Sequence, residues 1–347
     1  MSARAWDRAC AVAVVLMAAA CGDDARAPAP MPLIDDKLPA GFPAGSPVTL
    51  APADNALTEA RAQLGKRLFF DKQLSRTRAV SCSTCHLPQH AFAEPNAVST
   101  GVDDRRGTRN APALVNLAWG DSFFWDGRVA TLEEQAGKPI AHPDEMDLAL
   151  ADAVARIDAD ASYAPAFADA YGGPPTETSL RYAIASFVRV LVSGDSPYDR
   201  HLRGDDAAFG DAERRGEAIF LDKGGCFHCH PAGMLTNEGF FNNGSATDGG
   251  DAGRQMVTNR TGDAGKFKVP GLRNVEVTAP YMHDGALATL EDVIDHYDRG
   301  CNGHPATDPA IEPLALSADE KADLLAFLRA LTDQAFLADP RWAAPTP

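Results

Sequence analysis

The segments Cys82-Ser-Thr-Cys85-His86 and Cys226-Phe-His-Cys229-His230 carry the most specific pattern in the chain. Each is a complete Cys-x-x-Cys-His motif, the spacing that attaches c-type haem through two thioether bonds. The histidine after the second cysteine is placed to bind the iron as its proximal ligand. The sequence therefore predicts two covalently attached haem c groups.

Other uses of paired cysteines fit these segments less well. A redox dithiol normally lies in a βαβ pattern, which the sequence lacks, and structural zinc does not require a histidine directly after each second cysteine. Disulfides are the third alternative. Two complete motifs in one chain favour haem over all three. The remaining Cys301 is expected to be a buried or idle thiol rather than a catalyst.

Length and composition limit the possible classes. A chain of 347 residues with 45% hydrophobic residues is long enough for two hydrophobic cores, so we expect two domains. The net charge of -16 argues against nucleic acid as a partner, because phosphate binding needs clustered lysine and arginine. No apolar run of membrane-spanning length follows the N-terminal segment, so no transmembrane helix is expected in the mature chain.

The N-terminal segment has the pattern of an export signal. Arg4 and Arg8 precede an apolar run over residues 9–20, and small residues lead directly into Cys21. The pattern predicts a signal peptide over residues 1–20 and a lipid on Cys21. Residues 21–47 are rich in proline and alanine and are expected to form a tether. We therefore expect a periplasmic lipoprotein that meets the membrane only through its lipid anchor.

Several segments occur twice. Gly65–Lys72 matches Gly216–Lys223, and each lies just before a Cys-x-x-Cys-His motif. Two further pairs of segments share one offset, since 270 − 112 and 283 − 125 both give 158. These pairs are Pro112–Asn116 with Pro270–Asn274, and Trp125–Glu133 with His283–Glu291. The matches predict two haem domains, residues 48–203 and 204–340, that arose by internal duplication.

The same offset places Pro139 opposite Tyr297. Proline has no side-chain donor for iron, whereas a tyrosine phenolate can bind haem iron. If position 297 faces the second iron, the corresponding face of the first haem is open to a small ligand. The alternative is that both residues are packing residues.

Hydrophobic periodicity predicts an all-α fold with long loops. Apolar residues recur at three- and four-residue spacing in five stretches, and Ser317 is placed to cap the last. These stretches are Leu57–Phe70, Leu180–Val192, Ala212–Leu221, Leu290–Tyr297 and Ala318–Leu331. Residues 236–268 are rich in glycine, asparagine and aspartate and predict a long surface loop that contributes to a haem rim.

With these residues in view, the chain resembles the bacterial di-haem cytochrome c peroxidase family, including its MauG-like branch. The likeness runs from about Leu64 to Leu331 and rests on an ordered series of segments beside the two haem motifs. These are LGKRLFFD (64–71), RGTRNAPAL (106–114), FFWDGR (123–128), LEEQA (132–136), PDEM (143–146), LRNVEVTAPYMHDG (272–285) and TLEDVIDHY (289–297).

The resemblance implies two cytochrome c-like helical domains, with a peroxide-reactive haem in residues 48–203 and an electron-transfer haem in residues 204–340. It places Glu145 at the position of the distal carboxylate, which moves a proton from one peroxide oxygen to the other. Heterolysis of the O–O bond needs this proton because hydroxide is a poor leaving group. Gln135 matches the distal amide and Pro139 the residue over the iron. Trp125 matches the aromatic residue between the haems.

The resemblance also implies one calcium ion between the haems. Asn110, Thr278 and Pro280 match its ligands, with the asparagine side-chain oxygen and two backbone carbonyls as donors. Such hard oxygen donors suit calcium.

Two departures from the common pattern of the family affect the expected chemistry. Tyr297 stands where typical members place methionine, as in the MauG-like branch, and a tyrosine ligand lowers the ferric/ferrous potential. Met282 is the alternative ligand for the second iron. The offset of 158 pairs Met282 with Phe124, which cannot bind iron, and this favours a packing role for both residues. No histidine occurs between His90 and His142. We therefore expect an open first haem at rest, with His142 as a pocket residue.

The sequence thus predicts a di-haem c-type peroxidase, an oxidoreductase that reduces hydrogen peroxide at the His86 haem. Electrons are expected to pass through the second haem from a small redox protein, such as a cytochrome c or a cupredoxin, or from a protein substrate as in MauG-like enzymes. One alternative is a di-haem electron-transfer cytochrome without peroxidase activity. Another is a structural or metal-trafficking lipoprotein.

Overall fold

The computed structural model describes residues 30–31, 42–245, 250–302 and 306–345. The expected signal peptide, Cys21 and most of the expected tether lie outside these residues. Across the described ranges, no helix is both long and apolar enough to cross a bilayer.

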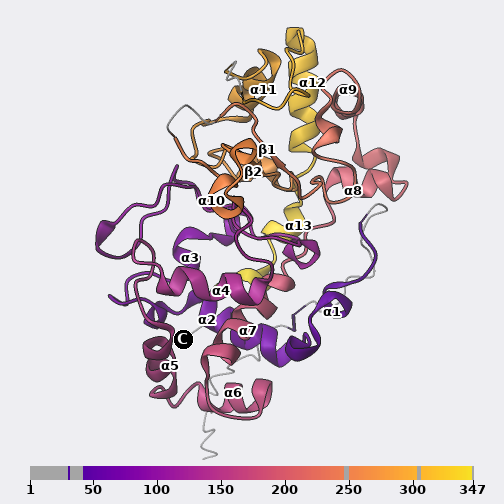
Figure 1. Ribbon diagram of the computed structural model, residues 1–347. Helices are drawn as coiled ribbons and strands as arrows, with labels where there is room; N and C mark the ends of the chain where they lie inside the picture. The colour runs from indigo at the N-terminus through magenta and orange to yellow at the C-terminus, as the bar shows by residue number, and fades with distance from the viewer. Residues whose placement is uncertain (1–29, 32–41, 246–249, 303–305, 346–347) are drawn as a thin grey trace, which may run out of the picture.

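Helices dominate the described chain, and they form two halves that lie one above the other (Figure 1). The helices of the first half are α1 (Pro47–Leu50), α2 (Glu59–Phe70), α3 (Cys82–Cys85), α4 (Leu132–Ala141), α5 (Leu150–Asp158), α6 (Ala164–Tyr171) and α7 (Glu177–Arg189). Those that follow are α8 (Pro197–Leu202), α9 (Asp211–Leu221), α10 (Gln255–Thr258), α11 (Leu290–Asp298), α12 (Ala318–Arg329) and α13 (Gln334–Leu337).

Single 3-10 turns link many of these helices. They are η1 (Ala53–Asn55), η2 (Lys72–Leu74), η3 (Pro88–His90), η4 (Val102–Asp104), η5 (Leu117–Trp119), η6 (Asp206–Ala208), η7 (Cys226–His228), η8 (Thr261–Asp263), η9 (Val275–Val277) and η10 (Pro340–Trp342). The described residues contain one sheet, in which β1 (Phe240–Phe241) pairs antiparallel with β2 (Phe267–Lys268).

The five helices predicted from periodicity are confirmed as α2, α7, α9, α11 and α12. Four of them, α2, α7, α11 and α12, start directly after a capping serine or threonine, because a helix leaves its first N–H groups without partners, whereas α9 starts after Gly210 without a side-chain cap. Ser317 accepts a hydrogen bond from the backbone of Glu320, as expected of an N-cap. Helix α4 was missed by the periodicity, because Gly137 and Pro139 interrupt its apolar pattern.

The prediction that residues 236–268 form a long surface loop, contributing to a haem rim, needs correction as to the surface loop. This segment contains β1, α10 and β2, and its Asn242 and Phe267 side chains are only 1% and 6% exposed. Asn242 can be buried because its side-chain oxygen accepts a hydrogen bond from the Gly244 backbone. The high content of small polar residues therefore marks tight, internally bonded turns that form part of a cavity wall.

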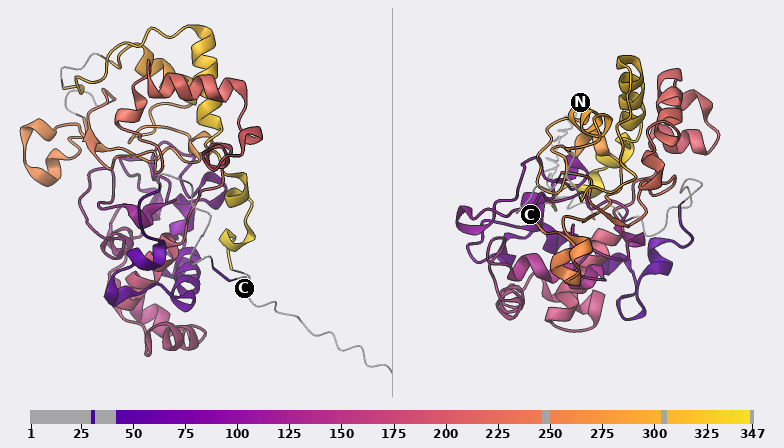
Figure 2. Two further views of the ribbon diagram at one scale, coloured as in Figure 1. Left: turned by 90° about the vertical axis from the view of Figure 1, so that its right-hand side faces the viewer. Right: turned by 45° about the horizontal axis from the view of Figure 1, so that its top comes forward.

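The first hydrophobic core lies between α2, α4 and α7. Phe69, Phe92 and Phe187 form its centre through edge-to-face contacts, with ring centroids 5.2–6.0 Å apart. The C-terminal segment runs back down to this core (Figure 2), where Phe336 and Trp342 of α13 and η10 pack against it. The last described helices thus fasten the upper half to the lower one.

The second core is built mainly on α9 and α12, which pack against each other. Phe327 of α12 is its hub and contacts Tyr198, Phe209 and Phe220. These contacts fix the end of α9, after which the second haem motif begins directly.

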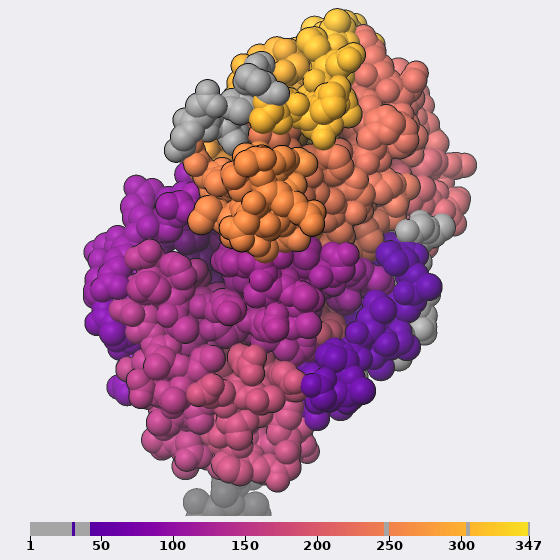
Figure 3. Space-filling view, viewed as in Figure 1, coloured from indigo at the N-terminus to yellow at the C-terminus, as the bar shows by residue number. Residues whose placement is uncertain are grey.

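A buried polar network joins the halves. The side-chain amide of Asn116 donates to the backbone carbonyl of Ser193 and accepts from the backbone N–H of Ser193. The hydroxyl of Ser193 also accepts a bond from the side-chain amide of Asn274. Asp333 closes the network by accepting bonds from the backbone of residues 194 and 195. On one face, the segment around α10 (orange) covers the boundary between the halves (Figure 3), and Arg254 there donates to the carbonyls of Asp126 and Gly127.

Each core depends on a glycine where two helices touch. A Cβ atom on Gly65 of α2 would lie 1.8 Å from the backbone oxygen of Ala183 in α7. One on Gly216 of α9 would lie 2.0 Å from the backbone oxygen of Asp323 in α12. Both distances are shorter than any non-bonded contact, so the helices approach closely only because these residues lack a side chain.

Replacing Gly65 by alanine is expected to lower the free energy of unfolding by about 1–3 kcal/mol, because an overpacked helix contact forces the helices apart. Chemical denaturation of the holoprotein measures this change. Gly173→Ala is the matched control, since a Cβ there meets no atom within 4 Å. Equal midpoints for the two variants would contradict the packing argument.

Candidate haem sites

The first haem motif lies on the short helix α3 and the turn that follows it. Ser81 caps α3 in a reciprocal pair with Thr84, which presents Cys82 and Cys85 on one turn. His86 donates from Nδ1 to the carbonyl of Phe92 at 2.7 Å. This bond leaves Nε2 as the nitrogen for iron, and burial lowers the pKa of His86, which keeps the imidazole neutral as a ligand must be.

The second motif repeats this arrangement on η7. His230 donates from Nδ1 to the carbonyl of Leu235 at 2.9 Å, and burial lowers its pKa to about 4. Both motif histidines are therefore neutral and oriented by a backbone carbonyl five or six residues further on. Such an orienting bond is typical of histidines that bind metals.

No disulfide joins the four motif cysteines, all of which lie in the described part of the chain. Burial raises the pKa of Cys82, Cys85 and Cys226 to about 12. Reactive redox dithiols have lowered pKa values instead. The thiols therefore do not fit a thioredoxin-like role, and they fit thioether attachment to a haem.

A cavity of about 270 Å³ adjoins the second motif. Cys226, Cys229 and His230 line it together with Tyr297 and Met282. The rest of its wall is largely apolar and includes Phe220, Phe241, Leu272, Val275, Ile294 and Leu324. An apolar slot with two thiols, a neutral histidine and an oxygen donor fits a covalently attached haem c.

Tyr297 occupies the eighth position of α11, a helix that begins after the Thr289 cap. Its hydroxyl receives a hydrogen bond from the side-chain amide of Asn243 at 3.1 Å. Burial raises the pKa of the Tyr297 phenol, and the bond from Asn243 opposes this shift. The phenolate form therefore needs a positive charge beside it, which a ferric haem supplies.

Glu145 lies in the turn that follows α4. Its carbonyl accepts a bond from the backbone of Val102 at 2.8 Å, and Gly101 packs so closely that a Cβ there would lie 2.4 Å from the same oxygen. Burial raises the pKa of Glu145, while the nearby His142 opposes the shift. The Glu145 charge also acts on the thiols of Cys82 and Cys85, so the carboxylate is near the first motif.

Gln135 and Pro139 lie one turn apart on α4, and both are half-buried. Pro139 takes the eighth position of its helix, as Tyr297 does in α11. The carbonyl of Pro139 accepts a bond from the backbone of Met146 at 3.2 Å. The chain therefore folds back so that Glu145 is held next to Pro139.

Trp125 belongs to the first half of the chain but lines the cavity beside the second haem motif. Its indole N–H donates to the carbonyl of Asn110 at 2.8 Å, and its own carbonyl accepts from the backbone of Lys268 at 2.7 Å. Both bonds fix the indole at the boundary between the halves.

Asn110, Thr278 and Pro280 line the same cavity. Asn110 is only 5% exposed, and its amide nitrogen donates to the carbonyls of Glu94 and Asn96. This orientation leaves the side-chain oxygen of Asn110 as its remaining donor atom for a cation.

The structure also locates the histidines and the rival ligand. His90 donates to the carbonyl of Val277 at 2.9 Å, in the other half of the chain. The ring of His142 lies 3.7 Å from the Glu145 carboxylate, and its side chain is 47% exposed. Met282 lines the cavity beside the second haem motif, as Tyr297 does, and its sulfur accepts a hydrogen bond from the side-chain amide of Asn243 at 3.1 Å.

Sequence reasoning missed Asn243 and His283. Asn243 lies in an Asn-Asn-Gly run, which predicts only a turn, and nothing in its spacing points to the haem motif. His283 stacks on Phe267 with ring centroids 3.7 Å apart, and its buried Nδ1 has no hydrogen-bond partner in the described part of the chain. Its match to Trp125 in the repeated segments was the available signal.

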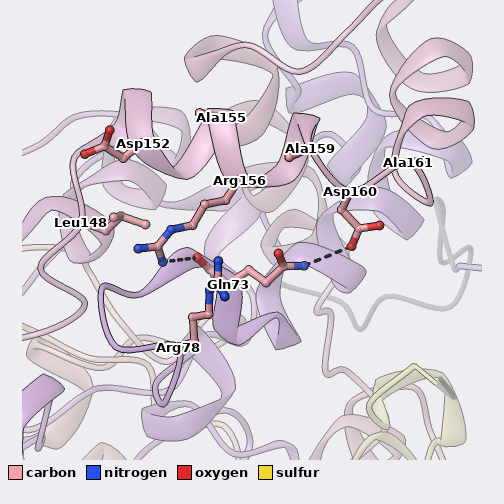
Figure 4. Close-up of a pocket in the computed structure, with 9 residues that line it drawn as sticks. All are labelled: Gln73, Arg78, Leu148, Asp152, Ala155, Arg156, Ala159, Asp160 and Ala161. Carbon is pink, nitrogen blue, oxygen red and sulfur yellow. Dashed lines mark hydrogen bonds between the residues drawn. The ribbon is translucent and has the colours of Figure 1, made fainter.

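A second hollow, of about 740 Å³, opens beside α5 and η2. Figure 4 shows that Arg156 and Asp160 there are hydrogen-bonded to Gln73. None of the haem-motif residues or the candidate catalytic residues lines it. This hollow is therefore separate from the haem sites.

Two neutral histidines, each beside a pair of buried cysteines, and a helical scaffold fit a di-haem c-type protein. Comparison with known proteins agrees. Residues 59–207 match the family model of di-haem cytochrome c peroxidase. The methylamine utilization protein MauG of Methylorubrum extorquens is 40% identical over 284 residues, which cover 81% of this chain and 80% of that protein.

Two further relatives point the same way. The cytochrome c551 peroxidase of Pseudomonas aeruginosa is 33% identical over 286 residues, which cover 80% of each chain. The crystal structure of a MauG-like protein associated with microbial copper homeostasis aligns with a TM-score of 0.84 and 35% identity, over 90% of this chain and 99% of that one. The chain belongs to the di-haem cytochrome c peroxidase family, and it is an oxidoreductase acting on peroxide.

Proposed function

We propose that the protein reduces hydrogen peroxide at the haem bound by His86 and draws electrons through the haem bound by His230 and Tyr297. The observation that carries this assignment is the difference between Pro139 and Tyr297 at the same position of two helices. Proline offers iron no donor, so the first haem keeps a face for peroxide. Tyrosine occupies the second.

The bound haems supply the iron centres that accept and donate electrons. Glu145 takes the proton from the peroxide oxygen nearer the first haem and returns it to the outer oxygen, which then leaves as water. Gln135, one turn before Pro139, donates from its amide to orient the peroxide. Trp125 lies between the sites and provides the aromatic path for an electron.

Glu145→Gln is expected to slow the reaction of the diferric holoenzyme with stoichiometric peroxide by about a hundredfold or more, since an amide cannot relay the proton. Stopped-flow recording of the Soret band measures the rate. The parent rate should fall as the pH drops through the pKa of Glu145, which burial raises above that of an ordinary carboxyl group. The variant should lose this dependence.

The exposed Glu134 in α4 offers a matched control, and Glu134→Gln should react at the parent rate. An undiminished rate in Glu145→Gln would remove the carboxylate from the mechanism. If the parent shows no spectral change with peroxide, the alternative of an electron-transfer cytochrome takes its place.

The electron source is a small redox protein, such as a cytochrome c or a cupredoxin, or a protein substrate. The likeness to MauG and the tyrosine at position 297 support the second source, because a tyrosine ligand favours oxidised iron. A lasting spectral change when diferric enzyme meets peroxide supports a protein substrate. A requirement for prior reduction of the second haem supports the redox protein.

Tyr297→Met is expected to raise the reduction potential of the second haem, because a neutral thioether stabilises ferric iron less than a phenolate does. Spectroelectrochemical titration measures the potential. Tyr281→Phe serves as the control, because Tyr281 lines the same cavity but donates its hydroxyl to the carbonyl of Val275. A potential that stays at the parent value in Tyr297→Met would show that Tyr297 does not bind the iron.

We also propose that residues 48–203 and 204–340 are haem domains related by duplication. The offset of 158 supports this, since it relates the starts of α4 and α11 at positions 132 and 290. It also relates Asn116 to Asn274, both of which adopt a left-handed backbone with φ of 62°. An export signal over residues 1–20 and a lipid on Cys21 remain the proposal for localisation, which is the periplasm.

A calcium ion bound by Asn110, Thr278 and Pro280 completes the proposal. The buried, oriented Asn110 amide supports it, and hard oxygen donors are what calcium prefers. Asn110→Leu should abolish one equivalent of calcium in metal analysis of the holoprotein and change the spectrum of the second haem. Calcium content equal to that of the parent would rule out this ligand set.

A further inference from the structure

The side chain of Asn243 contacts both residues that could bind the second iron. Its amide nitrogen lies 3.1 Å from the hydroxyl of Tyr297 and 3.1 Å from the sulfur of Met282. An amide nitrogen carries two hydrogens and no acceptor, so one N–H can serve each atom. All three residues line the cavity of the second motif.

The orientation of the Asn243 amide is fixed by its other end. Its side-chain oxygen accepts bonds from the hydroxyl of Ser245 at 2.7 Å and from the Ser245 backbone at 3.2 Å. An oxygen held by two donors cannot exchange places with the nitrogen without losing both bonds. The nitrogen therefore faces Tyr297 and Met282.

The backbone of this segment is tied to α11 as well. The carbonyl of Asn243 accepts a bond from the ring of His296 at 2.9 Å, and His296 directly precedes Tyr297. Gly244 has φ of +72°, and a Cβ there would lie 2.6 Å from the Cβ of Cys301, so the segment also packs closely against the turn that follows α11. Asn242, held by the backbone of Asp308 at 2.8 Å, anchors the other side.

We propose that Asn243 is a positioning residue for the second haem. Its amide holds the Tyr297 oxygen in place and draws electron density from it. The same amide hydrogen-bonds the sulfur of Met282, which keeps that sulfur from binding the iron. A hydrogen bond to an anionic ligand weakens its donation to iron, so Asn243 sets the potential of this haem higher than an unbonded tyrosine would. This inference rests on the proposed role of Tyr297 as ligand.

The test compares Met282→Leu with the double variant Asn243→Leu/Met282→Leu, both as holoproteins. Removing the sulfur first prevents methionine from replacing tyrosine when the amide is lost. Loss of the amide should lower the potential, so that the ferric-to-ferrous ratio at a fixed applied potential rises about tenfold, the usual scale for one bond to a charged group. Resonance Raman bands of the bound tyrosine should persist at shifted frequency.

An equal or higher potential in the double variant overturns the proposal. Asn243→Leu is also added to the variant Tyr297→Phe/Met282→Leu, in which no tyrosine oxygen remains for the amide to act on. If it lowers the reduction potential there by as much as it does in Met282→Leu, the amide does not act through Tyr297 and the proposal is overturned. If Tyr297→Phe/Met282→Leu has the same potential as Met282→Leu, Tyr297 is not the ligand and both proposals fail. The two failures are therefore distinguishable.

Ser245→Ala keeps the test decisive if the leucine variant does not retain two haems. It removes one of the two donors that orient the Asn243 amide and leaves the amide in place. A smaller shift to lower potential supports the proposal, whereas an unchanged potential overturns it.

Discussion

The molecule depends on what each helix presents to the open face of its haem. A Cys-x-x-Cys-His motif holds the edge of a haem through two thioethers and one face through its histidine, so the reactivity of the iron depends on the residue at the other face. Pro139 and Tyr297 stand at the eighth position of α4 and α11. Under the proposed assignment, Pro139 offers the first iron no donor and Tyr297 offers the second an oxygen, so the two sites would be inequivalent although the histidine sides are alike.

Burial acts on both key oxygen groups in the same direction, with opposite chemical consequences. It raises the pKa of Glu145 and of Tyr297, which favours the protonated form of each. For Glu145 this suits a group that must both accept and return a proton. For Tyr297 it means that the proposed ligation of ferric iron would also require loss of the phenolic proton, so the two events would be coupled.

The sequence was sufficient for the parts of the structure that follow local rules. Haem motifs, capped amphipathic helices such as α12, and the register between Pro139 and Tyr297 depend on spacing along the chain. Helix α4 and the wall around Asn243 did not follow from spacing. Gly137 and Pro139 hide the helix, and the Asn-Asn-Gly run predicts a turn whether or not it faces a cavity. Contacts between residues 54 positions apart, such as Asn243 with Tyr297, are set by tertiary packing.

The close approach of helices explains why such distant contacts are reproducible. Gly65 and Gly216 bring the helix before each haem motif, α2 and α9, against its partner helix, and the buried network of Asn116, Ser193 and Asn274 fixes the two halves to each other. Trp125 is thereby carried from the first half into the cavity of the second. In the proposed function, this rigid packing is what would let the residue at one helix position determine where peroxide reacts and the residue at the other determine where electrons enter.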